Sequence, residues 1–365
     1  MPDPLSPHEP ADSFRVDSEP HSPLRRENGD GRFEPAIDES YAADRVASYE
    51  PVWVPVAAPR VRNRVWLHAL LFAVTILTTT LVGIGHWLAF VDDFGAGPLG
   101  VLSPTQILEL HSRYWYMGFW YSATILTILG AHELGHYFAC RYYRIDASLP
   151  YFLPVPPPVE TGTLGAFIRI RQPITTKRML FDIGIAGPLA GFVFAVPALF
   201  LGVALSHVSR VPADFSGWEL GEPLLFKLAS HVVWGSVPDG YSLNLHPMAF
   251  AAWFGLLATA LNLFPIGQLD GGHISYAVLK TQSTKLTYLT LTALVALNVV
   301  LAARYGTPAL LLFTVLIVVM LAVFGPRHPP VIDEAVPLDR PRVALAIVAL
   351  AIFILCFTPV PIRVV

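Results

Sequence analysis

Two histidines and a glutamate stand at a spacing that suits metal-assisted hydrolysis. Residues 132–136 read His-Glu-Leu-Gly-His. Histidines at positions i and i+4 of a helix lie on one face, where both imidazoles can reach one metal ion. A glutamate beside the first histidine can act as general base on a water molecule at that metal. The pattern therefore predicts a zinc site with His132 and His136 as ligands and Glu133 as base.

The sequence around this motif is apolar, unlike the flanks of a soluble zinc enzyme. Residues 115–121 are mostly aromatic and residues 123–129 mostly aliphatic. Ionisable side chains are costly inside a membrane, and those found there usually have a function. Two structural histidines satisfied by their neighbours are the alternative interpretation, and a membrane-embedded metal site is favoured over it.

The composition is that of a multi-pass membrane protein. Of the 365 residues, 54% are hydrophobic and 14% are charged, with a mean hydropathy of +0.53. These values exclude an ordinary soluble domain. The net charge of -3 and the lack of a basic cluster indicate no nucleic-acid partner. Cys140 and Cys356 lie in or near apolar segments and are expected to be buried thiols rather than a disulfide.

The chain divides into a polar tail and a membrane domain. Residues 1–62 are rich in proline, serine and acidic residues, and they contain no lysine and no long apolar stretch. Such a segment buries too little apolar surface to fold alone and does not resemble a cleavable signal peptide. We expect residues 1–62 to be a disordered acidic cytoplasmic tail. Residues 63–365 are expected to be the transmembrane domain, with a catalytic core at about 115–280.

Seven apolar segments could cross a bilayer as helices, since a span needs about 20 apolar residues. They lie at residues 65–90, 115–143, 179–207, 247–275, 286–304, 308–325 and 343–360. Arginine and lysine are concentrated before the first span and after the second, fourth and sixth, so those loops should be cytoplasmic. The predicted fold is an all-α polytopic membrane protein with about seven transmembrane helices and a cytoplasmic N-terminus. The histidine motif should lie in the cytoplasmic half of the second span.

A third metal ligand is expected near the end of the fourth span, because a catalytic zinc site needs three protein ligands and an open position. Asp270 lies there at the predicted depth of His132. Pro265 and Gly267, just before it, should break the helix and free backbone groups that need partners in protein or water. Packing alone does not explain a carboxylate on such a broken helix. His273, just beyond, is expected to neighbour the site without binding the metal.

The segment between the second and third spans should not be helical. Five prolines lie between positions 150 and 158, and residues 166–171 alternate between apolar and polar. We expect a short re-entrant β-hairpin beside the metal site. Its free edge could pair with an unwound substrate by strand addition. A plain cytoplasmic loop is the alternative.

Together these motifs resemble those of the site-2 protease family, the intramembrane zinc metalloproteases. The paired motifs have the same order and spacing here: His132-Glu133-x-x-His136, then Asn262-x-x-Pro265-x-x-x-x-Asp270-Gly271. Residues 186–191, Ala-Gly-Pro-Leu-Ala-Gly, resemble the small-residue motif of the family's middle core helix, where small residues let helices approach closely. Residues 162–167 and 327–338 resemble the branch of archaeal, bacterial and chloroplast members. Neither residues 145–178 nor residues 208–246 are long enough for the inserted peptide-binding domain of some bacterial relatives.

The resemblance implies a fold and a ligand set. It implies a three-helix catalytic core and one Zn2+ per chain, held by His132, His136 and Asp270. Glu133 would be the general base and then the proton donor to the leaving amine. Asn262 would hold the substrate backbone or the oxyanion. The positions expected to bind substrate are Gly162, Gly165, Ile168 and Pro265.

The implied activity is hydrolysis of peptide bonds in or near the transmembrane segments of other membrane proteins. The implied partners are a transmembrane protein substrate and the lipid bilayer. The expected location is a cell membrane, as a multi-pass protein of a prokaryotic plasma membrane. No feature of the sequence indicates an oligomeric state.

Three other functions fit parts of the sequence. A membrane di-iron oxygenase would need several histidine clusters, and the sequence has one at 132–136. A metal-ion transporter could use His and Asp side chains at mid-depth, but no inverted repeat is visible and Glu133 would have no task. A catalytically inactive membrane scaffold is the third alternative, although every motif residue that the chemistry needs is present.

Overall fold

The computed structural model describes residues 64–97, 103–157, 159–213, 217–305 and 328–364, with a few short pieces outside these ranges. The chain separates into two units, Met1–Val61 and Arg62–Val365. In the first unit, the described backbone is one antiparallel pair, β1 (Arg25–Glu27) with β2 (Phe33–Pro35). The disordered tail predicted at 1–62 and the span predicted at 308–325 lie mostly outside the described residues.

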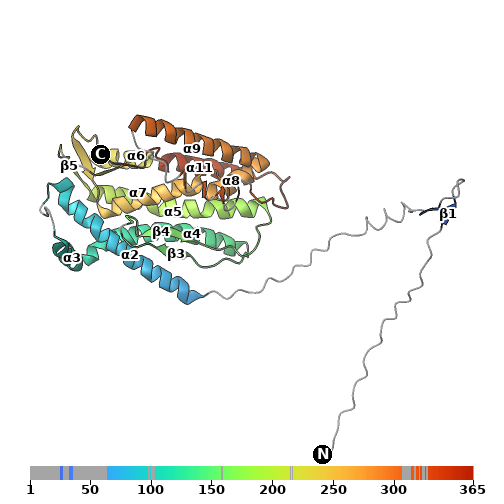
Figure 1. The fold of residues 1–365 in the computed structure, drawn as a ribbon, viewed down its shortest axis with the longest axis horizontal. Coiled ribbons are helices and arrows are strands. Elements are labelled where there is room, and N and C mark those ends of the chain that lie inside the picture. Colours follow the sequence, from blue (N-terminus) through green and yellow to red (C-terminus); the bar gives the residue numbers. More distant parts are fainter. Residues whose placement is uncertain are drawn as a thin grey trace, which may run out of the picture. The chain divides into compact units, whose positions relative to one another are not determined.

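The second unit is mostly helical (Figure 1). Its described α-helices are α2 (Val65–Asp92), α3 (Pro104–Arg113), α4 (Phe119–Tyr142), α5 (Lys177–Leu205), α6 (Leu224–Trp234), α7 (Pro247–Leu263), α8 (Asp270–Leu279), α9 (Ser283–Tyr305) and α11 (Arg340–Cys356). Short 3-10 turns are η1 (Asp93–Gly95), η2 (Trp115–Gly118) and η3 (Lys280–Gln282). The strands are β3 (Tyr151–Pro154), β4 (Thr163–Phe167), β5 (His207–Arg210), β6 (Trp218–Leu220), β7 (Tyr241–Asn244) and β8 (Ile362–Val364).

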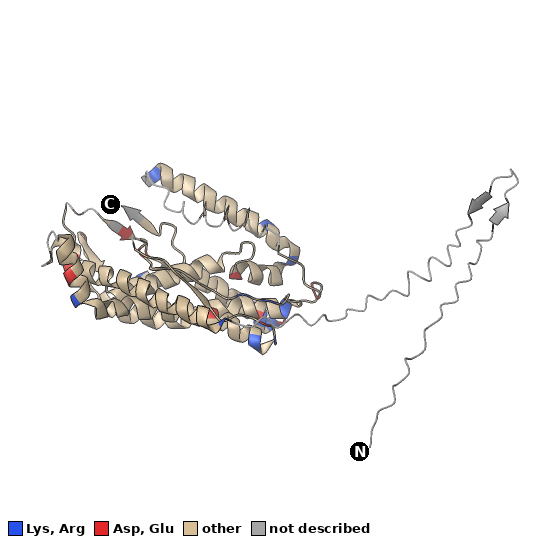
Figure 2. Cartoon of the chain, turned by 60° about the horizontal axis from the view of Figure 1, so that its bottom comes forward, with Lys and Arg blue, Asp and Glu red and all other residues tan. Residues whose placement is uncertain are grey.

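Three helical segments in the described part of the chain are long and apolar enough to cross a membrane: Val65–Gly95, Lys177–Leu205 and Asp270–Arg304. They overlap the spans predicted at 65–90, 179–207 and 286–304. The third segment is not one continuous helix. Lys280 has a positive φ of 57° and ends α8, and α9 begins at Ser283. In Figure 2 most of the coloured charged residues lie near helix ends, and long stretches of helix between them contain no Lys, Arg, Asp or Glu. This distribution matches a membrane protein.

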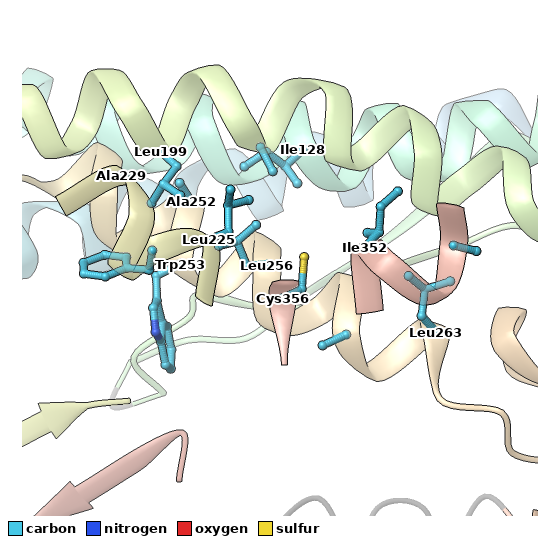
Figure 3. Packing of buried hydrophobic residues seen from close by; sticks show 14 of the residues in the cluster. Ile128, Leu199, Leu225, Ala229, Ala252, Trp253, Leu256, Leu263, Ile352 and Cys356 are labelled. Atoms are coloured by element: carbon cyan, nitrogen blue, oxygen red, sulfur yellow. The ribbon is translucent and has the colours of Figure 1, made fainter. Parts of the chain in front are cut away.

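Helix α5 is the centre of this unit and packs against α4, α6, α7, α8 and α11. Leu199 of α5 and Trp253 and Leu256 of α7 are fully buried in the largest apolar cluster (Figure 3). Cys356 of α11 is buried in the same cluster, and Cys140 is buried in another. Both are free thiols, as predicted. The segments predicted to span at 343–360 and 115–143 form α11 and α4. Neither is among the three long apolar segments of the described chain, and the count of seven spans stays a prediction.

A two-stranded antiparallel hairpin, β3 with β4, lies between α4 and α5 in the chain. The strand predicted at 166–171 starts earlier than expected, at Thr163, and regular pairing ends at Phe167. Ile170 then pairs with Ala147 in an isolated bridge. The alternating pattern located β4 approximately. The limits of β4 are set by its partner β3, and the prolines in and around β3 hide the alternation that would have predicted that strand. The hairpin therefore exists, with limits shifted toward the N-terminus.

Helix α2 holds the turn of this hairpin. The Thr78 hydroxyl donates to the carbonyl of Gly162 at 2.7 Å, and the Tyr121 hydroxyl of α4 donates to the carbonyl of Thr161 at 3.0 Å. Gly162 has a φ of +66°, and a Cβ there would lie 2.8 Å from the Cα of Thr79. Two features of this position therefore require glycine: the positive φ and the close contact with α2.

Replacing Gly162 by alanine should therefore destabilise the membrane unit. The positive φ alone is unfavourable by about 1–2 kcal/mol for alanine, and the clash with α2 adds a packing penalty of similar size. Gly165→Ala is the matched control, because Gly165 has a φ of +102° but open space around its Cβ position. Thermal unfolding in detergent should show the larger loss for Gly162→Ala. Equal losses would mean that the contact with α2 contributes little.

Two further strand pairs lie outside the predicted elements. β5 pairs with β7, and β6 pairs with β8 from the C-terminal end of the chain. The first pair is tied to the end of α2 because the Asp93 carboxylate accepts from Ser209 at 2.9 Å and from Asn244 at 2.8 Å. These contacts join residues far apart in sequence, which explains why no local pattern indicated them.

Candidate metal centre

Helix α4 turns three ionisable side chains toward the protein interior. His132, Glu133 and His136 are 6%, 8% and 7% exposed, whereas Phe138 on the other side of the helix is 63% exposed. The Nε2 atoms of the two histidines lie 3.1 Å apart. The i, i+4 spacing thus places both imidazoles at one point, as the sequence predicts.

Small residues let α4 and α5 approach closely at this level. A Cβ on Gly135 of α4 would lie 2.4 Å from the carbonyl oxygen of Ala186. A Cβ on Gly187 of α5 would lie 2.1 Å from Nε2 of His136, and one on Gly191 would lie 3.2 Å from Cβ of His132. The small-residue motif at 186–191 therefore makes room for the two imidazoles.

One carbonyl fixes the orientation of the second histidine. Nδ1 of His136 lies 2.7 Å from the carbonyl oxygen of Ile183 on α5. A carbonyl can only accept, so Nδ1 carries the proton. In the neutral ring this leaves the lone pair on Nε2, the atom that faces His132, which is the tautomer that a metal ligand needs.

The helix break expected between Asn262 and Asp270 is present. Helix α7 ends at Leu263 and α8 begins at Asp270, so the span predicted at 247–275 consists of two helices. Gly267 in the break has a φ of +53°. The hydroxyl of Thr287 on α9 accepts from the Gly267 N–H at 3.4 Å and donates to the Pro265 carbonyl at 3.3 Å. Backbone groups freed by the break thus find a partner within the protein, which is the condition for such a break in a membrane-spanning helix.

Two glycines after Asp270 set the start of α8. A Cβ on Gly271 would lie 2.1 Å from the carbonyl oxygen of Leu263, and one on Gly272 would lie 2.3 Å from that of Gly267. The sequence Asp-Gly-Gly therefore lets the first turn of α8 pack directly against the end of α7 and the break. This packing directs Asp270 toward α4.

His132, His136 and Asp270 meet at one point. Oδ2 of Asp270 lies 3.2 Å from Nε2 of each histidine. In tetrahedral zinc sites with bonds of about 2.0–2.2 Å, ligand atoms lie about 3.3–3.6 Å apart. The separations observed here are within a few tenths of an ångström of that range. Two imidazole nitrogens and one carboxylate oxygen are a ligand set that fits a hydrolytic zinc ion.

Two more of the predicted residues lie beside this group. Nδ2 of Asn262 lies 3.2 Å from Nε2 of His132. The backbone N–H of Ile168 donates to the Glu133 carboxylate, which joins the residue after β4 to the proposed base. The hairpin is therefore next to the site.

The other residues predicted to bind substrate have different surroundings. Pro265 lies in the helix break. Gly165 is half-buried in β4, and Gly162 is buried against α2. A role in substrate binding stays a prediction for all three.

Sequence reasoning missed the groups that support the site. Ile183 and Thr287 belong to no motif. Every residue has a backbone carbonyl, so the sequence cannot indicate that the carbonyl of Ile183 binds His136. His328 lies 2.8 Å from His273, between Nε2 and Nδ1 respectively. His328 belongs to the segment 327–338 that resembles the family branch, but nothing in the sequence indicated that it lies beside His273.

Comparison with known families identifies the same region. The sequence model of Peptidase family M50 matches residues 120–303, about half of the chain. This match includes α4, the hairpin, α5, α7, the break and α8. No solved structure gives a significant match.

The chain is also similar to curated plant proteins. It is 34% identical over 158 residues to the probable zinc metalloprotease EGY2, chloroplastic, of Oryza sativa subsp. indica, covering 41% of this chain and 27% of that protein. It is 28% identical over 238 residues to EGY2 of Arabidopsis thaliana, covering 64% and 40%. Similarity to the probable zinc metalloprotease EGY1, chloroplastic, of Arabidopsis thaliana is 33% over 158 residues, covering 41% and 27%. The matched region thus spans about a quarter to two fifths of the length of these relatives.

Proposed function

Because the chain belongs to Peptidase family M50, the site-2 protease family, we propose that it is a zinc metalloendopeptidase that cuts membrane proteins within the bilayer. The observation that carries this proposal is the meeting of His132, His136 and Asp270 at 3.1–3.2 Å beside the buried Glu133. The names of the plant relatives as probable zinc metalloproteases support it.

The proposed chemistry assigns a task to each side chain. Zinc, when bound, polarises the scissile carbonyl and makes water more acidic. Glu133 takes a proton from the attacking water and then gives it to the leaving amine. The Ile168 N–H holds the Glu133 carboxylate in position. Asn262 supplies amide donors close to His132, where the oxyanion of the tetrahedral intermediate would develop.

The proposed membrane arrangement has about seven spans with the hairpin re-entrant beside the site. Basic residues support a common cytoplasmic side, since they occur at the end of α4, the start of α5, the end of α8 and the start of α11. Lys280 and Arg342 also contact other segments at this end of the helices. The N-terminus of α2 is then cytoplasmic. The domain limits proposed from sequence, 1–62 and 63–365, differ by one residue from the boundary between the compact units.

The proposed substrate is a transmembrane segment of another protein that unwinds near the site. A helix satisfies its own backbone groups, so the segment must be extended before hydrolysis. The hairpin supports this proposal, because strands offer backbone groups to an extended peptide. Its second strand, β4, ends at Phe167, and the next residue, Ile168, contacts Glu133 through its backbone N–H.

The proposed location is a prokaryotic plasma membrane. The plant relatives are chloroplastic by name, which makes a membrane of plastid type the second location to test. Fractionation of cells that express the chain distinguishes the two.

Zinc content tests the proposal directly. Detergent-purified wild type should contain about one zinc ion per chain, and Asp270→Ala should contain little, because it loses one of three protein ligands. Asp239→Ala, which removes a carboxylate from an exposed turn, is the matched control and should bind zinc like wild type. If the folded, monodisperse wild type bound no zinc even after zinc was added back, the proposed protease function would be refuted and a scaffold function favoured.

A further inference from the structure

A segment that leads into α11 contacts two of the helices that support the metal centre. Residues 328–342, called the strap below, begin with His328-Pro329-Pro330, form a turn at 332–335 and end in the start of α11. The proposed chemistry uses none of these residues. The strap contacts both α8, which carries Asp270, and α5, which supports α4.

The strap binds α8 through a histidine pair. Nδ1 of His328 lies 2.7 Å from the Pro329 carbonyl and therefore carries a proton. Its Nε2 then accepts from Nδ1 of His273 at 2.8 Å. The His328 ring also stacks on Tyr276, with 4.3 Å between ring centroids and an angle of 21°. Burial lowers the pKa of His328, which favours the neutral ring that this arrangement requires.

The strap binds α5 through backbone and charge. The Ile332 N–H donates to the Thr175 carbonyl at 2.9 Å, just before the helix. The Asp333 carboxylate accepts from the Lys177 N–H at 2.7 Å. Lys177 begins α5, so Asp333 satisfies one of the free N–H groups of that helix with a negative charge, which the helix dipole favours.

Apolar and ionic contacts complete the link between the two helices. Val331 of the strap is buried in one cluster with Leu180 of α5 and Tyr276 of α8. At the far end, Arg342 donates from Nε to the Asp182 carboxylate at 2.8 Å. Asp182 directly precedes Ile183, whose carbonyl orients His136. The strap therefore touches both sides of the ligand set.

The metal centre depends on this link because its ligands come from separate helices. His132 and His136 are fixed to α5 by the glycine contacts of α4 and by the Ile183 carbonyl. Asp270 is on α8, which follows a non-helical break. A Cβ on Gly184 of α5 would lie 3.0 Å from Cβ of His273, so α8 also packs closely on α5. Zinc tolerates ligand displacements of only about 0.2 Å, so the position of α8 on α5 decides whether the third ligand is in place.

From these contacts we infer that the strap positions Asp270 for metal binding and that His328 is a positioning residue, acting through His273 and α8. The inference rests on the proposed zinc site and extends it to residues outside the ligand set. Loss of an outer partner of a metal site commonly lowers metal affinity about 10–100-fold.

Zinc affinity of two strap variants tests the inference. His328→Phe keeps a ring to stack on Tyr276 but loses the acceptor for His273, and Asp333→Ala loosens the strap on the α5 side. Both should bind zinc at least about 10-fold more weakly than wild type in competition with a chromophoric chelator in detergent. His231→Phe makes the same change on the exposed face of α6 and should bind zinc like wild type. Melting of the zinc-free proteins is measured in parallel.

The outcomes separate this inference from the proposed function. Wild-type zinc affinity in both folded strap variants would overturn the inference and leave the zinc site intact. Zinc-free variants that melt earlier but bind zinc normally when folded would also overturn it, because the strap would then only stabilise the fold. A wild type that binds no zinc would overturn the proposed function and this inference together. Weak zinc binding by both variants with normal melting would support it.

Discussion

Glu133→Gln should reduce peptide hydrolysis by about 1,000-fold or more while leaving zinc content unchanged. General acid–base catalysis contributes about 10²–10⁴ to the rates of such reactions, and glutamine cannot take up the proton. The change is otherwise small, because glutamine keeps an oxygen that accepts from the Ile168 N–H. The cleavage of synthetic single-span peptides by the detergent-purified protein is measured by mass spectrometry. Zinc is determined on the same sample.

The matched control for this variant is Glu109→Gln. Glu109 lies on the exposed helix α3, outside the metal centre, and the chemical change is the same. Its activity should equal that of wild type. If Glu133→Gln held zinc and still cut peptides at the wild-type rate, Glu133 would not be the base. A zinc-bound wild type that cuts no peptide under any condition would favour a transporter or an inactive scaffold.

Gly187→Ala should remove the metal centre without touching a ligand. The new Cβ would lie 2.1 Å from Nε2 of His136 and 2.5 Å from two of its ring carbons. Such contacts are impossible, and the ring is held by the Ile183 carbonyl on the same helix. Either the imidazole leaves its position or α4 and α5 separate. Zinc content should fall from about one ion per chain to a small fraction, and activity should fall with it.

Gly191→Ala provides the comparison one turn along α5. Its Cβ would meet Cβ of His132 at 3.2 Å, which requires a shift of only a few tenths of an ångström. That variant should keep most of its zinc. Circular dichroism and size-exclusion chromatography establish that both proteins are folded. Full zinc binding by Gly187→Ala would contradict the close packing of α4 on α5.

Local patterns were sufficient to predict the ligand group of the metal centre. The spacing of His132 and His136 fixes their common helix face, and Pro265 with Gly267 marks a break that the structure contains. The glycines of residues 186–191 indicated close helix packing, which the contacts of Gly187 confirm. Each of these signals acts within a few residues. The metal role of the three ligands, and the catalytic role of Glu133, stay predictions.

The rest of the site depends on contacts between distant parts of the chain. Arg342 and Asp182 are 160 residues apart, and no pattern in the sequence connects them. The pairing of β6 with β8 and the strap's contacts with α5 are of the same kind. The limits of β4 were misplaced for a related reason, since a strand ends where its partner stops pairing.

The division of the ligands between α4 and α8 also has a consequence in time. A ribosome makes the chain from its N-terminus, so His132 and His136 are synthesised before Asp270 and the strap. A partly synthesised chain holds only two of the three ligands that a catalytic zinc ion requires. If the chain is the peptidase proposed above, it cannot hydrolyse peptides until translation has passed α8.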